Sequence, residues 1–197
     1  MSEPTPNKIK YGLKNVYYAK ATIATDGTAT YDTPVAFPGA VSLSMDPSGD
    51  NVNFYADNIV YWVGNGSTGY SGDLEIARVT DSFKKDILGM WEDNKDVLVE
   101  KLNSEIVHFA LLFQFEGDQK ATRHIMYNCT CTRPSAAGNT KSESVEPQTE
   151  TVTITATSIY CAPLQCDIVK AEATVGTDSA TYNGWFSAVY QTTTAST

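Results

Sequence analysis

The sequence predicts a mainly β fold, and three observations lead to that prediction. β-Branched and aromatic residues are concentrated in runs such as residues 21–33 and 149–160, and these side chains suit a pleated sheet better than a helix. Several runs alternate between apolar and polar residues, as half-buried strands do. Turn-forming residues such as Gly, Pro, Asn and Asp separate the runs. A single short stretch has helical spacing, so one helix is expected against the sheet.

The chain is long enough for one domain. A length of 197 residues allows a domain that buries most of its apolar surface. Its hydrophobic content of 42% supplies a core, whereas 19% charged residues is low for a cytoplasmic enzyme. We expect a single domain over residues 1–197, with a flexible N-terminus at residues 1–8 and a frayed tail at residues 191–197.

The charge balance argues against a surface that grips nucleic acid. The net charge is −9 and the isoelectric point is near 4.6, whereas proteins that hold nucleic acid neutralise its phosphates with clustered Lys and Arg. An acidic surface can instead line a passage through which DNA slides, because like charges repel.

The N-terminal sequence indicates folding in a cytoplasm, which in turn suggests a role for the cysteines. Residues 1–12 lack the apolar stretch of a secretory signal, and no window approaches the roughly 20 apolar residues that cross a bilayer. In a reducing compartment cysteines usually act as small apolar side chains. Cys129 and Cys131 lack the C-x2-C spacing of a zinc knuckle. A disulfide between Cys161 and Cys166 is sterically possible but is disfavoured in a reducing cell.

The first third of the chain predicts hairpins. A run of β-forming residues ends at Asp26-Gly27, a pair that favours a tight turn, and residues 28–31 form the return strand. Residues 40–45 alternate and stop at a turn signal. Residues 51–63 follow, either as a strand pair or as one long bent strand.

One stretch then changes to helical spacing. After an alternating strand over residues 70–80, Thr80 or Asp81 can cap a helix, and Gly89 suits its end. Apolar residues three to four apart predict a helix over residues 81–91 that packs on the sheet. Its packing stripe consists of Phe83, Ile87, Met90 and Trp91.

The second half predicts the centre of the sheet. Residues 106–115 are apolar on both faces, as in a strand that is covered on each side. Residues 96–103 fit either a helical or a strand period, so their structure stays open. The alternation of residues 121–132 places one set of side chains on a common face, namely Ile125, Tyr127, Cys129 and Cys131.

A long loop interrupts the later strands. Residues 133–150 combine Pro, Gly, Ser and acidic residues with almost no apolar anchor, and loops of this length are usually functional or disordered. The run that ends at residue 160 then returns to the core, and a Tyr-rich stretch at residues 181–190 precedes the tail.

No motif indicates catalysis. His108 and His124 fall within alternating strands, without the neighbours that would mark a nucleophile. Acidic residues are scattered without a distinct pair, and the Gly-rich turns lack the Lys of a phosphate-binding loop. We therefore expect no catalytic residue, no cofactor and no metal.

Four motifs, taken in order, resemble a known family. They are KNVYYA near the start, SGDLEIARVTDSFKKDILGM across strand and helix, SVEPQTETVTITAT after the long loop, and TYNGWF near the end. Together they resemble the major tail tube proteins of long-tailed phages, particularly those that infect Gram-positive bacteria. The resemblance implies a β-sandwich or partly closed barrel of antiparallel strands with one flanking helix. It also implies six copies per ring, rings stacked into a tube, and an acidic lumen for the genome.

The implied partners are those of a virion tail. They are further copies of the chain, the tape measure protein, the tail-tip and terminator proteins, and phage DNA that passes without sequence-specific binding. From the resemblance we also expect that no membrane is involved and that assembly takes place in the host cytoplasm.

Two groups of residues are candidates for this role. One face of the strands within residues 50–80 is expected to point into the lumen, while the other packs on the helix. The loop over residues 133–150 is expected to order against a neighbouring ring. The lumen candidates are Asp50, Asp57, Asp73 and Glu75, and the loop candidates are Arg133, Lys141, Glu143, Glu146 and Gln148.

Two alternatives remain. A tail terminator, a tail-tip ring protein or a capsid decoration protein would share a small β fold. A carbohydrate-binding module would also be acidic and rich in Thr and aromatic residues, with Trp62, Trp91 and Trp185 as sugar platforms. We expect Trp91 to lie on the buried stripe of the helix and at least one other tryptophan to lie in the core or in an interface, which would disfavour the second alternative.

Overall fold

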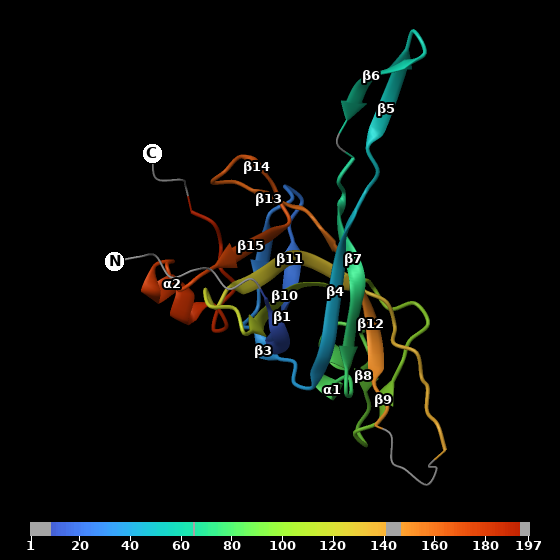
Figure 1. Cartoon of the computed structure of the whole chain (residues 1–197). Helices are drawn as coiled ribbons and strands as arrows, with labels where there is room; N and C mark the ends of the chain where they lie inside the picture. Colours follow the sequence, from blue (N-terminus) through green and yellow to red (C-terminus); the bar gives the residue numbers. More distant parts are fainter. Residues whose placement is uncertain (1–8, 65, 141–146, 194–197) are drawn as a thin grey trace.

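A computed structural model describes residues 9–64, 66–140 and 147–193 of the chain (Figure 1). The strands are β1 (Tyr11–Ile23), β2 (Ala29–Tyr31), β3 (Val35–Ala36), β4 (Ala40–Ser48), β5 (Val52–Ala56), β6 (Ile59–Gly64), β7 (Gly69–Ile76), β8 (Trp91–Glu92), β9 (Leu98–Val99), β10 (His108–Glu116), β11 (Arg123–Cys131), β12 (Glu150–Thr157), β13 (Ile159–Cys161), β14 (Cys166–Ile168) and β15 (Lys170–Ala173). The helices are α1 (Asp81–Asp86) and α2 (Ser179–Gly184).

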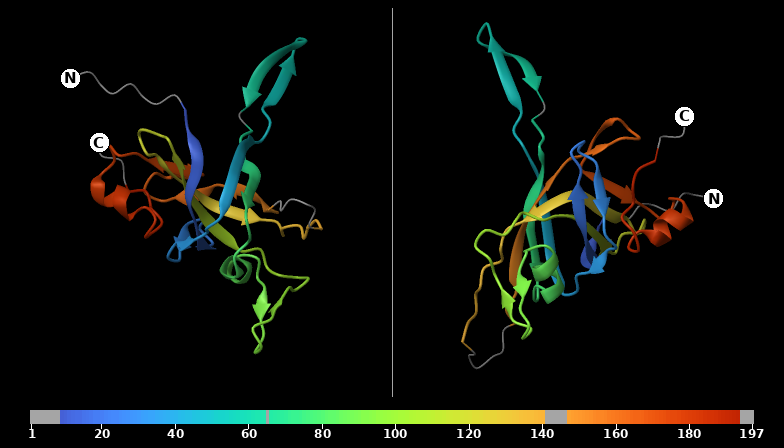
Figure 2. Two further views of the ribbon diagram at one scale, coloured as in Figure 1. Left: turned by 60° about the horizontal axis from the view of Figure 1, so that its bottom comes forward. Right: turned by 180° about the vertical axis from the view of Figure 1, so that it is seen from behind.

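One antiparallel sheet organises the molecule. Its strand order is β2-β1-β10-β11-β12-β7-β4, with β15 also pairing β11 and β3 also pairing β1. The expected mainly antiparallel β fold with a flanking helix is confirmed, and the sheet is not closed into a barrel. Three small hairpins lie outside it: β5–β6, β8–β9 and β13–β14 (Figures 1 and 2).

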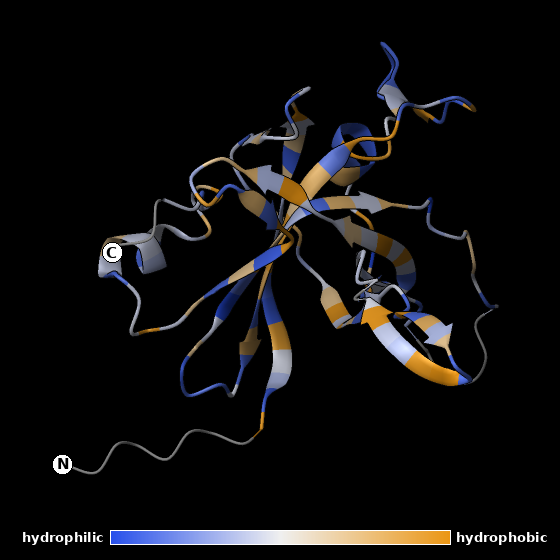
Figure 3. Ribbon diagram, turned by 90° about the horizontal axis from the view of Figure 1, so that it is seen from above, coloured by the Kyte–Doolittle hydropathy of each residue, from blue (hydrophilic) through white to orange (hydrophobic). Residues whose placement is uncertain are grey.

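The sheet is covered on both faces at its centre. Side chains of β10 alternate between two core clusters: Phe109 and Leu111 belong to the first, and Ala110 and Leu112 to the second. The first cluster joins β10 to β7, β12 and α1, and the second joins it to β15 and Trp185. This arrangement explains the run over residues 106–115 that is apolar on both faces. Bands of apolar and polar residues alternate along several strands (Figure 3).

The alternation expected along β11 is wrong at one point. Ile125 and Tyr127 belong to the second cluster, but Cys129 belongs to the first. Phe109 pairs with Cys129 whereas Leu111 pairs with Met126, so β11 contains an extra residue relative to β10. A β-bulge of this kind reverses the direction of the side chains that follow it.

The helix is shorter than expected. Thr80 caps α1 by accepting a hydrogen bond from the Phe83 backbone N–H at 3.3 Å, as predicted, but the helix ends at Asp86 instead of residue 91. The chain turns at Gly89, whose φ of +66° favours glycine. Phe83 and Ile87 are buried as expected, Met90 is half-buried, and Trp91 is 54% exposed in β8. The prediction that Trp91 packs under the helix is therefore wrong.

The structure confirms the predicted turn and settles two segments whose structure the sequence had left open. The Asp26-Gly27 turn joins β1 to β2 as expected. Residues 51–63 form a strand pair, β5–β6, and residues 96–103 contain β9, which pairs with β8. The start of the Tyr-rich C-terminal stretch lies in the unexpected helix α2, which is capped by the Asp178 carboxylate.

Candidate functional site

Three strands at the β4 end of the sheet present hydroxyl and carboxylate side chains on one side. Cross-strand pairing arranges them in rows, for example Ser44 beside Asp73 and Asp73 beside Thr153. None of the nine residues in these rows is basic. We call this surface the carboxylate–hydroxyl face, and it consists of Ser42, Ser44, Asp46, Ser71, Asp73, Glu75, Thr151, Thr153 and Thr155.

The face follows from the period of the strands. In β12, Val152, Ile154 and Ala156 are buried while the threonines between them are exposed, because successive side chains of a strand point to opposite sides. In β7, Leu74 and Ile76 lie in the first core cluster together with Phe83 of α1. One side of these strands therefore forms the core, and the other forms the carboxylate–hydroxyl face.

Hydrogen bonds order the carboxylates on this face. The Thr149 hydroxyl donates to Glu75 Oε1 at 2.6 Å, and the Ser42 hydroxyl donates to Glu75 Oε2 at 3.0 Å. The Thr153 hydroxyl donates to Asp73 Oδ1 at 2.7 Å. The bonds from Thr149 and then Ser42 lower the pKa of Glu75, because they stabilise its charged form. Glu75 therefore keeps its negative charge to a lower pH than an ordinary glutamate does.

The structure separates the four lumen candidates. Asp73 and Glu75 lie together on the carboxylate–hydroxyl face. Asp57 lies in the tight turn between β5 and β6, with a φ of +50°, and Asp50 lies two residues before the start of β5. The expectation that residues 50–63 pack on the helix is wrong, since almost every residue there is exposed.

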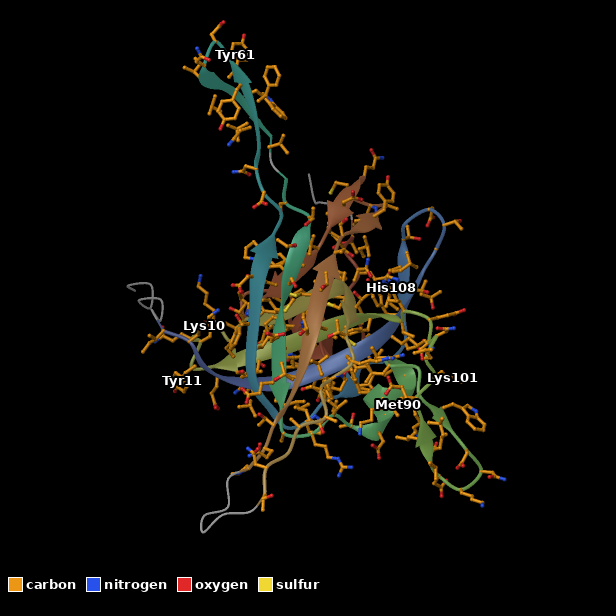
Figure 4. The ribbon with its side chains drawn as sticks, turned by 90° about the vertical axis from the view of Figure 1, so that its right-hand side faces the viewer. Lys10, Tyr11, Tyr61, Met90, Lys101 and His108 are labelled. Carbon is orange, nitrogen blue, oxygen red and sulfur yellow. The ribbon has the colours of Figure 1, made fainter. Side chains whose placement is uncertain are left out.

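The β5–β6 hairpin projects from the body of the molecule, and we call residues 50–64 the arm (Figures 1 and 2). Tyr61 lies near its end, far from Met90 and Lys101 (Figure 4). Large apolar side chains of the arm are exposed to between 46% and 71% of their surface. They are Val52, Phe54, Tyr55, Ile59, Val60, Tyr61, Trp62 and Val63.

Strand β4 forms one end of the sheet. It pairs with β7 along one edge, and within the described residues no strand pairs with its other edge. An unpaired edge is a template for pairing with another chain, and proteins usually shorten or charge such strands. This edge is nine residues long and carries Asp46 as its one charged residue.

The loop candidates fall into two groups. Arg133 contacts its own chain: its guanidinium pairs with Glu100 at 2.6 Å and donates to the backbone oxygen of Lys101 at 2.8 Å. Gln148 accepts a hydrogen bond from the Asn139 side chain at 3.3 Å. The other three, Lys141, Glu143 and Glu146, lie outside the described residues.

The tryptophans do not form a single platform. Trp62 is 57% exposed on the arm and Trp91 is 54% exposed in β8 at the opposite end of the molecule, whereas Trp185 is buried (Figure 1). Within the part of the chain that the structure describes, no cluster of His, Cys, Asp and Glu is suited to a metal ion. In the same part, no helix is long and apolar enough to span a membrane.

The sequence matches the model of the phage tail tube protein family over residues 5–192. The chain therefore belongs to this family. It is a structural, non-enzymatic component of a phage tail, located in the virion tail and assembled there with other tail components.

No curated protein matches the sequence. Among solved structures, the chain is similar to a chain in the six-fold symmetrised cryo-EM structure of the anti-feeding prophage baseplate, with 12% sequence identity and a TM-score of 0.42. That similarity covers 89% of this chain and 99% of the other.

Sequence reasoning missed two parts of the site. The Ser and Thr residues of β4 and β12 were not identified, although the alternation in TVTITAT was a usable signal. The arm was missed because its apolar run resembles a core strand. Only the tertiary structure shows that the arm is not covered.

Proposed function

We propose that this chain forms hexameric rings that stack into the tail tube, and that the carboxylate–hydroxyl face lines the channel through which phage DNA passes. The observation that carries the proposal is the composition of this face. It combines three carboxylates with six hydroxyls and lacks basic and aromatic side chains.

Such a surface suits the passage of a polyanion. Proteins bind DNA phosphates with Lys and Arg, and they stack exposed bases on aromatic rings. The face offers neither, and its carboxylates repel phosphates. The hydroxyls bind water and the carboxylates, which leaves a hydrated surface without strong DNA contacts.

Copies of the chain are the partners that the remaining surfaces fit best. The open edge of β4 can be completed by a strand from a ring neighbour, and the arm can bury its apolar side chains on another copy. A contact between different surfaces of identical chains closes into a ring or continues as a stack. The tape measure, tail-tip and terminator proteins would then meet the ends and the interior of the tube. On the basis of the motif resemblance, we propose that the phage infects a Gram-positive host.

Charge reversal on the face tests the channel assignment. We expect the triple variant Asp46→Lys, Asp73→Lys, Glu75→Lys to form tubes but to release DNA more slowly, because lysines would bind phosphates. Phage carrying the variant gene would be triggered in vitro, and DNA release followed with a fluorescent dye. Electron microscopy would show that tails are present.

A matched control makes the same change in net charge at positions outside the carboxylate–hydroxyl face. Asp32→Lys, Glu105→Lys, Asp167→Lys alters three exposed acids outside the face. We expect normal release from this control. Equal release from both triple variants would contradict the channel assignment.

Self-extension distinguishes the tube from other virion components. The purified chain at high concentration should give hexamers or long hollow tubes by negative-stain microscopy. A terminator, a tail-tip ring protein or a decoration protein would not self-extend. A chain that stays monomeric at all concentrations, even with its tail tip supplied, would contradict the proposal.

We also propose that the loop over residues 133–150 contacts a neighbouring ring. Its described residues are mostly exposed, and Arg133 fixes its start to the backbone near Lys101. Deletion of residues 136–146 should leave a folded chain, by circular dichroism, that no longer forms tubes. Tubes of normal length from the deletion variant would show that the loop is not a stacking element.

A further inference from the structure

The β13–β14 hairpin places two cysteines directly opposite each other. The register pairs Ile159 with Ile168, Tyr160 with Asp167, and Cys161 with Cys166. The two cysteines are the last pair before the turn, which contains a hydrogen bond from the Leu164 N–H to the Cys161 oxygen at 3.2 Å. Both thiols are free in this structure.

This register suits a disulfide. Residues directly opposite each other in an antiparallel pair have Cα atoms about 4.5–5.5 Å apart, and disulfides join Cα atoms about 4.4–6.8 Å apart. Directly opposite side chains also point to the same side of the hairpin. That side carries Ile159 and Ile168, which pack on the second core cluster. The two thiols therefore start close to each other and on the same side.

The two thiols differ in exposure, and this difference predicts which of them reacts first with an oxidant. Cys166 is exposed, and Cys161 is buried, with 6% of its surface accessible. The other two cysteines lie in β11, where burial raises the pKa of both thiols, that of Cys131 to about 12. Because the thiolate is the reactive form, these two are poor nucleophiles.

We propose that Cys161 and Cys166 form a disulfide once the protein leaves the reducing cell, with a small-molecule disulfide such as oxidised glutathione as the oxidant. The Cys166 thiolate attacks one sulfur of glutathione disulfide and releases one glutathione thiolate. The Cys161 thiolate then attacks the Cys166 sulfur of the mixed disulfide and releases the second. The two protein thiols are oxidised, the reagent is reduced to two thiols, and the two protons pass to the released glutathione.

The bond would fasten a hairpin that connects two parts of the sheet. β13 follows β12, and β14 leads into β15, which pairs with β11. The hairpin also contacts the β1–β2 turn, because the Tyr160 N–H donates to the Gly27 oxygen at 3.0 Å. A cavity of about 140 Å³ lies between it and Tyr31 and Tyr127. A disulfide would keep the hairpin closed over this cavity in the extracellular virion.

The test uses the full chain. The reduced protein is treated with oxidised glutathione under native conditions, and the product is examined by intact mass and by peptide mapping. We expect a loss of about 2 Da, corresponding to two hydrogens, and a peptide that links Cys161 to Cys166. Two of the four thiols should no longer react with a thiol reagent after denaturation.

Two variants serve as matched controls. Cys166→Ser should show no mass loss, and its exposed position leaves the fold intact, as circular dichroism would check. Cys131→Ser should form the bond as the unmodified chain does. A stable glutathione adduct on Cys166, a bond between chains, or a link to β11 would each overturn the proposal.

Discussion

At the scale of single residues, hydrogen bonds around the buried Asn128 side chain join three strands of the sheet. Asn128 is 7% exposed. Its carbonyl oxygen lies 2.6 Å from His108 Nδ1, and its amide donates to Thr157 Oγ1 at 2.9 Å and to the Ser158 oxygen at 3.1 Å. Since the Asn128 oxygen can only accept, Nδ1 of His108 carries the proton. The network satisfies polar groups at the point where β10, β11 and β12 meet.

Removal of Asn128 should destabilise the chain. Asn128→Ala removes the hydrogen bonds to half-buried His108 and to exposed Thr157 and Ser158, and one hydrogen bond typically contributes about 0.5–1.5 kcal/mol to stability. We expect a lower unfolding free energy in urea, with Thr155→Ala on the exposed side of β12 as the control. An unchanged midpoint for Asn128→Ala would mean that water replaces the network.

His124 gives the fold a pH dependence. Its ring stacks on Phe113, with the ring centroids 5.0 Å apart, and its Nδ1 lies 3.4 Å from the Glu172 carboxylate. Burial lowers the pKa of His124, although Glu172 opposes this shift and Lys10 and Lys170 add to it. The folded state therefore binds the proton less well than the unfolded state does.

The sign of the effect follows from that difference. Below the ordinary histidine pKa of about 6.5, the unfolded chain takes up a proton that the folded chain does not, so the unfolding free energy falls as the pH is lowered. His124→Gln should make the unfolding free energy less dependent on pH just below this value. Urea unfolding at several pH values measures the slope, and an equal slope in both proteins would refute this role.

At the scale of elements, helix α2 is attached through aromatic and cationic contacts. The Arg123 guanidinium lies 3.8 Å from the ring centroid of Tyr182 and donates to the Tyr182 backbone oxygen. Phe186 stacks on Tyr17 of β1, and the Trp185 indole N–H donates to the His124 oxygen at 3.3 Å. These contacts explain why the Tyr-rich C-terminal stretch packs against the sheet.

Arg123 should therefore control how tightly α2 is bound. Arg123→Met keeps an apolar stem but loses the cation–π contact and the hydrogen bond, together worth about 1–3 kcal/mol. Hydrogen exchange of residues 182–190 should become about tenfold faster or more. Lys170→Met, which removes a longer cation–π contact to Tyr70 at 5.4 Å, is the control. Unaltered exchange in Arg123→Met would show that the apolar contacts suffice.

At the scale of the whole molecule, the arm carries the longest run of exposed large apolar side chains among the described residues. The two core clusters bury apolar side chains on both faces of the sheet. The arm, in contrast, exposes aromatic side chains on both of its strands. A soluble chain rarely exposes a large contiguous apolar patch unless another molecule covers it. The arm is thus the part of the monomer that most needs a partner.

Polar substitutions in the arm should separate folding from assembly. Tyr61→Ser, Trp62→Ser changes two side chains that are 71% and 57% exposed, so monomer stability should change by no more than about 0.5 kcal/mol per site. Sedimentation and negative-stain microscopy should show loss of rings or tubes. The control is Val175→Ser, at an exposed valine outside the arm. Normal tubes from the arm variant would exclude the arm as an assembly surface.

Much of the local structure could be predicted from the sequence. The Asp26-Gly27 turn, the Thr80 cap and the two-faced apolar run of β10 depend on neighbours within a few residues, so their patterns are readable. Asp73 and Glu75 were placed on one face for the same reason, because the period of a strand fixes which side chains share a side. Their use as a channel surface stays a prediction.

The tertiary structure decided the rest, because those features depend on distant parts of the chain. The bulge in β11 exists only relative to β10, and the apolar runs in the arm and in β10 look alike until the fold covers one and not the other. Trp91 lies outside the helix because the chain turns at Gly89 and continues as β8, which pairs with β9. Periodicity determined which side of each strand is apolar. Strand pairing and burial determined which apolar sides the monomer covers and which it leaves for another chain.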